Sequence, residues 1–222
     1  MFFKKIKEDE HDFSNVRAVR IDSASLHLNL SLHSGAKTTT KLSGRSDQCE
    51  LIVTPQNAEG TVALFVKNES STQCTLDVGF PQTFTGRVEV FLTSGEVSSI
   101  GLSSDHIFQL TSGTMEILGK SIKSVNGGIQ AGTFKGSGLE GDASIDIGAG
   151  EVMIEYAKVP SKGAVRAHVM AGSIEIRLPG NAAYRATDYP SNDLKADILP
   201  KADSDFVLDL LCQKGKVKIR EK

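Results

Sequence analysis

The sequence predicts an all-β protein, built as a single-stranded β-solenoid (a β-helix-like stack) of coils of about 20 residues. Two observations carry this prediction: apolar and polar residues alternate over much of the chain, and a strand, Gly-turn, strand unit recurs along it. Alternation with a period of two is typical of half-buried strands, and recurrence at a steady interval is typical of stacked repeats. An antiparallel β-meander or sandwich is the alternative, because each unit would also suit a hairpin.

The N-terminal part of the chain is less regular than the rest. Residues 1–13 are polar and acidic after the first few positions, so we expect a flexible tail. Residues 14–222 are expected to form one all-β domain, with less regular strands over 14–86 and regular repeats over 87–220. Within the first portion, residues 26–32 alternate leucine with polar residues and predict a strand with one dry face.

The repeats are clearest when each is anchored on its central turn residue. Seven anchors are proposed, with asparagine replacing glycine once because it tolerates a left-handed backbone: Gly95, Gly113, Gly127, Gly150, Gly172, Asn192 and Gly215. The positions −5, −3, +2 and +4 from these anchors make 28 sites, of which 25 are apolar; the exceptions are Ser99, Ser124 and Thr187. Such strong alternation excludes helix over 87–220.

The positions between these inward sites are predicted to face outward. They also number 28, and only five are apolar, so the two faces are sharply distinguished. The five exceptions are Phe91, Val125, Met153, Met170 and Leu211.

Charged residues favour the stacked arrangement over hairpins. At +5 from the last four anchors stand Glu155, Arg177, Asp197 and Arg220, which would form a column of alternating charge if units stack in chain order. Residues 214–222 are densely charged, which would discourage aggregation at an open end of the stack.

Several short phrases resemble the bacterial putative adhesin family, whose domains of unknown function consist of Gly-turn strand repeats. The phrases are Thr-Ser-Gly-x-x-x-Ile at 111–117, Ala-Gly-x-Ile-x-Ile at 171–176 with Leu-Pro at 178–179, and Phe-Pro at 80–81. The likeness covers about residues 75–220, and more weakly the chain from residue 14. It implies a β-solenoid with an adhesive or scaffolding role and no established catalytic residues, and it would allow a cell-surface association.

Composition excludes several classes of protein. The formal net charge is −2 and the pI is about 6.2, unlike a nucleic-acid binder. With 39% hydrophobic residues the chain is too apolar to be disordered, and it contains no apolar run that could cross a membrane. The N-terminus lacks the apolar stretch of a secretory signal, so the sequence predicts a cytoplasmic location without direct membrane insertion.

The cysteines and histidines predict neither a metal site nor a cofactor site. Cys49, Cys74 and Cys212 are widely spaced, and without an export signal we expect thiols, although the first two could pair in an exported chain. His27 and His33 share one strand face but lie about 20 Å apart in an extended chain, too far for one metal. These two, with His11, His106 and His168, are therefore expected to face solvent.

Two patterns could indicate chemistry. Residues 136–141 match G-x-G-x-x-G, but the following residues alternate as a strand, whereas a dinucleotide fingerprint needs a helix there. Six carboxylates in consecutive units could cluster as in enzymes that cleave polysaccharides: Asp146, Glu151, Glu155, Asp188, Asp193 and Asp197. Interspersed lysines and arginines favour an ordinary mixed-charge surface instead.

The resulting hypothesis is a non-enzymatic, adhesin-like β-repeat domain that binds or scaffolds another macromolecule. We expect no catalytic, metal-binding or cofactor-binding residues. The partner would be a protein or a polysaccharide, and not a nucleic acid. The alternatives are a carbohydrate-active lyase or hydrolase using the clustered carboxylates, and a self-assembly domain.

Overall fold

The computed structural model describes residues 4–13, 15–45, 48–68, 74–188 and 194–222. This part of the chain is all-β and contains no helix. Its strands are β1 (Lys4–His11), β2 (Ala18–His33), β3 (Thr38–Arg45), β4 (Cys49–Val53), β5 (Thr61–Asn68), β6 (Cys74–Pro81), β7 (Arg87–Ile100), β8 (His106–Tyr156), β9 (Gly163–Leu178), β10 (Arg185–Asp188), β11 (Leu194–Ala196) and β12 (Phe206–Glu221).

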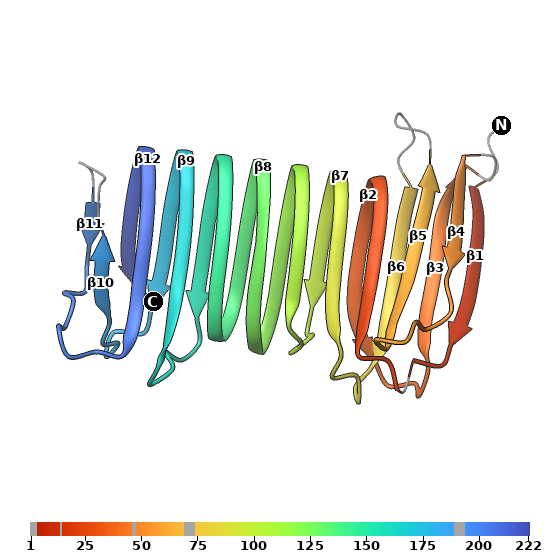
Figure 1. Cartoon of the computed structure of the whole chain (residues 1–222), viewed down its shortest axis with the longest axis horizontal. Helices are drawn as coiled ribbons and strands as arrows, with labels where there is room; N and C mark the ends of the chain where they lie inside the picture. Colours follow the sequence, from red (N-terminus) through yellow and green to blue (C-terminus); the bar gives the residue numbers. More distant parts are fainter. Residues whose placement is uncertain (1–3, 14, 46–47, 69–73, 189–193) are drawn as a thin grey trace.

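The long strands lie side by side in parallel and form an elongated row (Figure 1). β2 pairs with β7, β7 with β8, β8 with β9, and β9 with β12, each in parallel. Consecutive strands of a hairpin run antiparallel, so these parallel pairs are not hairpins. The antiparallel pairs of the structure all lie within residues 4–81.

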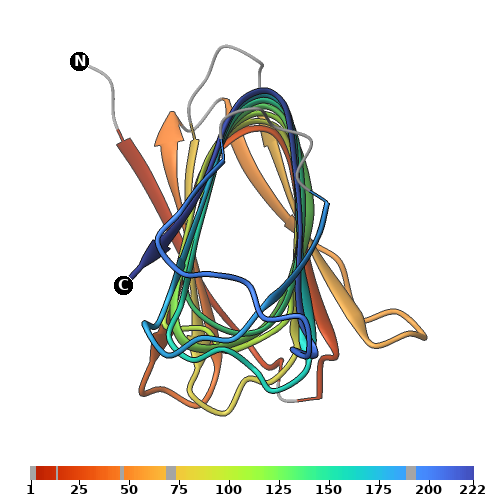
Figure 2. The ribbon, with the colours of Figure 1, turned by 90° about the vertical axis from the view of Figure 1, so that its left-hand side faces the viewer.

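From β7 onward each layer of the row bends at a glycine, which divides the layer into a first arm before the bend and a second arm after it. β8 contains three such bends, whereas β2 contains no glycine. Viewed along the row, the arms of successive strands superimpose as a flattened loop with an arch at one end (Figure 2). The bend glycines have positive φ and stack on one another, and in order they are Gly95, Gly113, Gly132, Gly150, Gly172 and Gly215. A side chain at any of them would collide with the backbone of the preceding layer; for Gly215 the nearest atom is the Gly172 carbonyl oxygen, 1.7 Å away.

One predicted anchor is wrong: the bend lies at Gly132, and not at Gly127. Gly132 has a φ of +152° and rests against the Gly113 backbone, whereas Gly127 occupies an inward position on the first arm. A Cβ at Gly127 would lie 2.6 Å from the ring of Phe108, which stacks on Phe134 with ring centroids 5.3 Å apart. The two aromatic rings fill the volume that an aliphatic side chain at position 127 would need, so this inward position is occupied by glycine. The apolar alternation is therefore weakest beside the true bend.

The core runs along the whole row between the two arms. Val152, Ile174 and Val217 face each other in register across three layers, and each is 1% exposed or less. The predicted inward and stacked placement of these three side chains is confirmed. Ser99 is also inward and buried, and its hydroxyl is 2.9 Å from the Nε2 of His106, so a polar residue is accommodated there.

At the C-terminal end, the order of strands in space departs from the order in the chain. β12 pairs directly with β9, and β10 and β11 lie beyond β12, so no layer intervenes between Gly172 and Gly215. The predicted anchor Asn192 lies outside the described residues. The charge column therefore reads Glu155, Arg177, Arg220, Asp197, and the predicted alternation is wrong.

A similar reordering builds the N-terminal end. β5 and β6 pair with the two arms of β2 on the side away from β7, although they follow β2 in the chain. Antiparallel strands then complete this end: β4 pairs with β5, β3 with β6, and β1 with β3. The expected flexible tail is corrected over residues 4–11, because these residues form β1 and gain a full ladder with β3.

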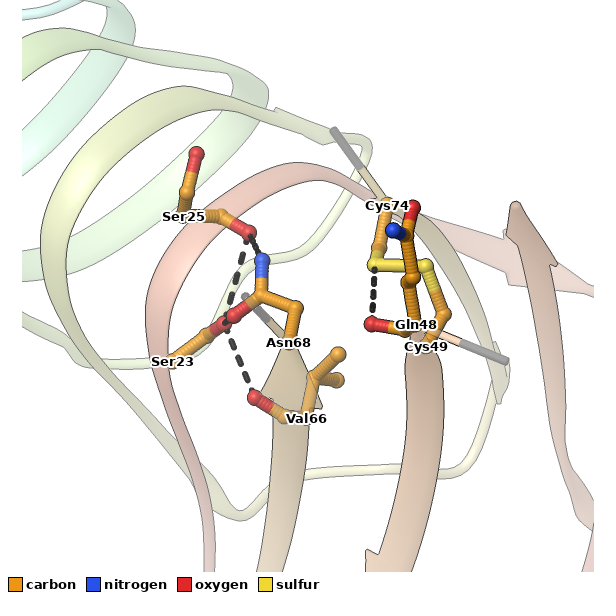
Figure 3. The surroundings of a disulfide bond; sticks show 7 residues. All are labelled: Ser23, Ser25, Gln48, Cys49, Val66, Asn68 and Cys74. Carbon is orange, nitrogen blue, oxygen red and sulfur yellow. Dashed lines mark hydrogen bonds between the residues drawn. A yellow bond between two sulfur atoms is a disulfide. The ribbon is translucent and has the colours of Figure 1, made fainter. Parts of the chain in front are cut away.

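A disulfide bond joins the two arms at this N-terminal end. Cys49 on β4 and Cys74 on β6 are bonded, with their Cα atoms 6.0 Å apart (Figure 3). The expectation of free thiols is wrong for this pair, because the tertiary structure brings together residues that lie 25 positions apart. Nearby, the amide of Asn68 donates to the Ser25 carbonyl and its oxygen accepts from Ser23, which ties the end of β5 to β2.

Candidate binding hollow on the outer face

The outward side chains of the first arms line up in rows across the layers, because neighbouring strands pair in register. Phe91 lies opposite Gln109, Asp146 opposite His168, and His168 opposite Leu211. A surface depression of about 610 Å³ runs over this face; we call it the outer hollow. Its main lining residues are Phe91, Ile107, Gln109, Asn126, Gly128, Gln130, Asp146, Gly148, His168, Met170, Leu211 and Gln213.

Two glycines create the depth of the outer hollow. Gly128 lies between Gln109 and Asp146 in the same row, and Gly148 lies beside the backbone of Gln130 in the next row. A Cβ at Gly128 would meet the side-chain amide of Gln109 at 3.1 Å and the backbone oxygen of Asp146 at 3.4 Å. Because neighbouring strands lie about 4.8 Å apart, the missing side chain leaves roughly 10 Å between the flanking strands.

A packed aromatic ring forms the wall of the hollow toward the N-terminal end. The guanidinium carbon of Arg20, in the adjacent layer, lies 4.4 Å from the centre of the Phe91 ring. Arg20 is itself held by the carboxylate of Asp22, at 2.8 Å and 2.9 Å, and this bond raises the pKa of Arg20. The cation and the ring position each other, so Phe91 presents a rigid apolar edge.

A histidine between two carboxylates forms the opposite wall. The Nδ1 of His168 is 3.7 Å from Asp146, and its Nε2 is 3.6 Å from Asp209. Next to them stand Met170, which is 60% exposed, and the half-buried Leu211. This wall therefore combines hydrogen-bonding groups with exposed apolar surface.

A sequence signal for this site existed in the exceptions to the alternation. Phe91, Met170 and Leu211 are three of the five apolar residues predicted to face outward, and all three line the outer hollow. A fourth, Val125, is buried because the register around Gly132 differs from the predicted one. The hollow itself was not predictable, because it depends on which residues of separate layers become neighbours.

The histidines are not uniformly solvent-facing as predicted. His106 is 1% exposed, and His168 is half-buried in the hollow. His27 pairs with Glu96 at 3.1 Å, while His33 accepts a hydrogen bond from the backbone of Gly35, so these two engage different partners. Within the described parts of the chain, no three histidine, cysteine, aspartate or glutamate residues gather as a metal-binding group.

The six candidate carboxylates do not form one cluster in the described part of the chain. Glu155 pairs with Lys222 at 2.7 Å, and Asp197 with Arg220 at 3.6 Å. Asp146 lies on a first arm, in the hollow, whereas Glu151 is exposed on a second arm. The side chain of Asp188 and all of Asp193 lie outside the described residues.

The glycine pattern over residues 136–141 lies within β8 and is followed by further strand. A Cβ at Gly141 would be 1.6 Å from the carbonyl oxygen of Lys123 in the adjacent layer. Close packing between layers therefore explains this glycine, and the helix that a dinucleotide site requires is absent from these residues. No helix in the described chain is long and apolar enough to span a bilayer.

Comparison with known proteins gives matches among solved structures. No known sequence family and no curated protein matches the chain. A putative adhesin from Bacteroides fragilis aligns with a TM-score of 0.52 at 13% identity, covering 99% of this chain and 98% of its own. A putative cell adhesion protein from Clostridium sporogenes (TM-score 0.47, 12% identity, 99% and 100% covered) and a putative adhesin from Parabacteroides merdae (0.33, 12%, 97% and 95%) also match. The Bacteroides protein shares the fold of this chain.

Proposed function

We propose that this chain is a non-enzymatic, adhesin-like β-solenoid module that binds or scaffolds another macromolecule through its outer face. The observation that carries the proposal is the outer hollow, a depression of about 610 Å³ formed by residues of successive layers. Its outward side chains are not needed for the core, which lies between the two arms. A flat, regular stack with a hollow of this kind is suited to contacting an extended partner.

The arrangement of charges supports binding over catalysis. A glycosidase needs two carboxyl groups facing the same bond, whereas Glu155 and Asp197 are each held by a cation. Asp146, the carboxylate that lines the hollow, faces a histidine. The carbohydrate-active alternative would require a second carboxylate to reach Asp146, and the neighbouring Asp209 instead contacts the far nitrogen of the same histidine.

The disulfide bond bears on the compartment in which the protein works. Disulfides persist in oxidising environments and are rare in the cytosol. The Cys49–Cys74 bond therefore supports folding outside the cytosol, in place of the cytoplasmic location expected from the N-terminal sequence. A surface location would suit an adhesive module.

Retention on immobilised macromolecules tests the proposed function. We expect the folded chain to be retained on at least one of mucin, collagen, cellulose and chitin columns, and to release no new reducing ends from the two polysaccharides. Flow-through on all four columns would contradict the proposal, and release of reducing ends would favour the enzyme. Light scattering distinguishes the self-assembly alternative, since only self-assembly predicts that the mass grows with concentration.

A further inference from the structure

We infer that the outer hollow binds an uncharged saccharide chain, an inference that rests on the proposed binding function. The first argument is the shape of the hollow. The backbone of Gly128 forms part of its floor, and the strands of Gln109 and Asp146 stand on either side of it. Gly128 itself is buried, with the Gln109 amide 3.1 Å from where its Cβ would lie. A slot about two strand spacings wide admits a flat ring when this flexible amide moves aside, and a side chain at position 128 would prevent that.

The second argument is the chemistry of the lining. Gln109, Asn126, Gln130 and Gln213 carry amides, and each amide both donates and accepts hydrogen bonds. Hydroxyl groups have the same dual character, so a polyhydroxyl ligand can satisfy such amides from either side. A ligand that only accepts hydrogen bonds would leave the amide oxygens unpaired, and a ligand that only donates them would leave the amide N–H groups unpaired.

The apolar part of the lining matches the remaining surface of a sugar. Phe91 and Met170 stand at opposite sides of the hollow and expose apolar edges, which suit the C–H faces of a pyranose ring. Neighbouring layers are spaced by about 4.8 Å, close to the length that one hexose adds to an extended chain. A saccharide lying across the layers would thus place successive rings over successive layers.

The charges of the hollow argue against an anionic polymer. No lysine or arginine belongs to the lining, and the carboxylate of Asp146 does. Arg20, which packs on Phe91 at the wall, is paired with Asp22. A phosphate, sulfate or uronate group would face Asp146 with no cation in the lining.

Titration calorimetry with defined probes tests this inference. The probes are cellohexaose, xylohexaose and mannohexaose as neutral chains, and hexagalacturonate as the anionic chain. We expect at least one neutral probe to bind with a Kd of about 1 mM or tighter, and hexagalacturonate to bind at least tenfold more weakly.

Three variants locate the binding. Gly128→Val fills the slot, where its Cβ would meet the flexible end of Gln109 at 3.1 Å and the Asp146 backbone oxygen at 3.4 Å, and we expect it to weaken the neutral probe at least tenfold. Gln109→Ala should weaken it about fivefold without changing the backbone. Lys135→Val is the matched control, because Lys135 is exposed beyond the Gly132 bend, on the second arm of the same layer, and should leave the Kd within twofold.

The outcomes separate this inference from the proposed function. If no neutral probe binds, yet Gly128→Val abolishes retention on collagen while the wild type is not retained on cellulose or chitin, the saccharide chemistry is wrong and the binding function stands. If retention is unchanged in Gly128→Val, the outer hollow is not the site and the inference is overturned. If the wild-type chain is retained nowhere and binds no probe, both are overturned.

Discussion

Glycine 132 illustrates how one residue governs the approach of two layers. Its φ is +152°, and a Cβ there would lie 1.8 Å from the carbonyl oxygen of Gly113. The same relation repeats at the other bends, so each glycine serves both the conformation of its own bend and the contact with the next layer. Gly128, only four residues earlier, is free of both constraints.

We therefore expect Gly132→Ala to lower the free energy of unfolding by about 3 kcal/mol or more, through backbone strain and forced separation of layers. Urea denaturation followed by circular dichroism measures this loss. Gly128→Ala is the matched control and should change stability by less than about 1 kcal/mol, because its new methyl group meets a flexible amide end at 3.1 Å and touches the Asp146 backbone oxygen only at an ordinary contact distance of 3.4 Å. Equal losses in the two variants would contradict the assignment of the bend.

A second residue, His106, makes stability depend on pH. Burial lowers the pKa of His106 from its ordinary value of 6.5 to about 4. Its Nδ1–H donates to the Ser104 carbonyl at 2.9 Å, so its Nε2 accepts from the Ser99 hydroxyl, an arrangement that suits the neutral ring. Between pH 6.5 and 4 the unfolded chain binds a proton at His106 that the folded chain does not bind. The contribution of the neutral His106 to the free energy of unfolding is therefore fully present above pH 6.5 and is lost on acidification.

Between pH 7 and pH 4 we expect the free energy of unfolding of the wild type to fall by about 3 kcal/mol more than that of His106→Gln. The glutamine amide can make both hydrogen bonds without titrating. Unfolding free energies measured by urea denaturation at several pH values give this difference. His27→Gln, a change at a half-buried histidine on the outer face, serves as the control and should leave the difference between wild type and His106→Gln in place. Parallel pH profiles for wild type and His106→Gln would show that His106 does not carry the effect.

At the scale of the element, each strand has one face in the common core and one in water. Ile154 and Ile176 are directly paired between β8 and β9 and have no exposed surface. Glu151, on the same arm as Ile154, is exposed. Whether a residue faces inward or outward therefore decides the effect of a substitution on stability more strongly than its place along the chain.

Ile154→Asp and Ile176→Asp are each expected to prevent folding, because they place an unpaired charge in the core. Glu151→Lys should change stability by no more than about 0.5 kcal/mol. Soluble yield and thermal unfolding compare the three variants. Folded Asp variants, combined with an unstable Glu151→Lys, would reverse the inward and outward assignment.

At the scale of the whole molecule, the two ends of the row are built differently from its middle. In the middle, one layer follows another in chain order from β7 to β9. At both ends the spatial order departs from the chain order. β5 and β6 follow β2 in the chain but lie beyond it at the N-terminal end, and β10 precedes β12 in the chain but lies beyond it at the C-terminal end. Such end layers cover strand edges that would otherwise pair with other chains.

The disulfide holds the N-terminal end layer together, and its loss should destabilise the molecule. Closing a loop with a sequence separation of 25 residues corresponds to about 3 kcal/mol, so Cys49→Ser should reduce the free energy of unfolding by about that amount. Reductant should destabilise the wild type to the same extent and leave Cys49→Ser unchanged; urea denaturation with and without dithiothreitol checks both. An effect of reductant on Cys49→Ser would show that the reductant acts elsewhere.

The amino-acid sequence by itself determined the all-β class, the inward faces of most repeats and, for the described residues of 87–220, the absence of helix, because alternation is a local property that each strand carries. Only the tertiary structure decided the bend at Gly132, since the rings of Phe108 and Phe134 take up space that Gly127 leaves open. It also decided the direct pairing of β12 with β9, the bonding of Cys49 to Cys74, and the assembly of the outer hollow. These features depend on which layers lie next to one another. That order is set by packing between segments that are far apart in the chain.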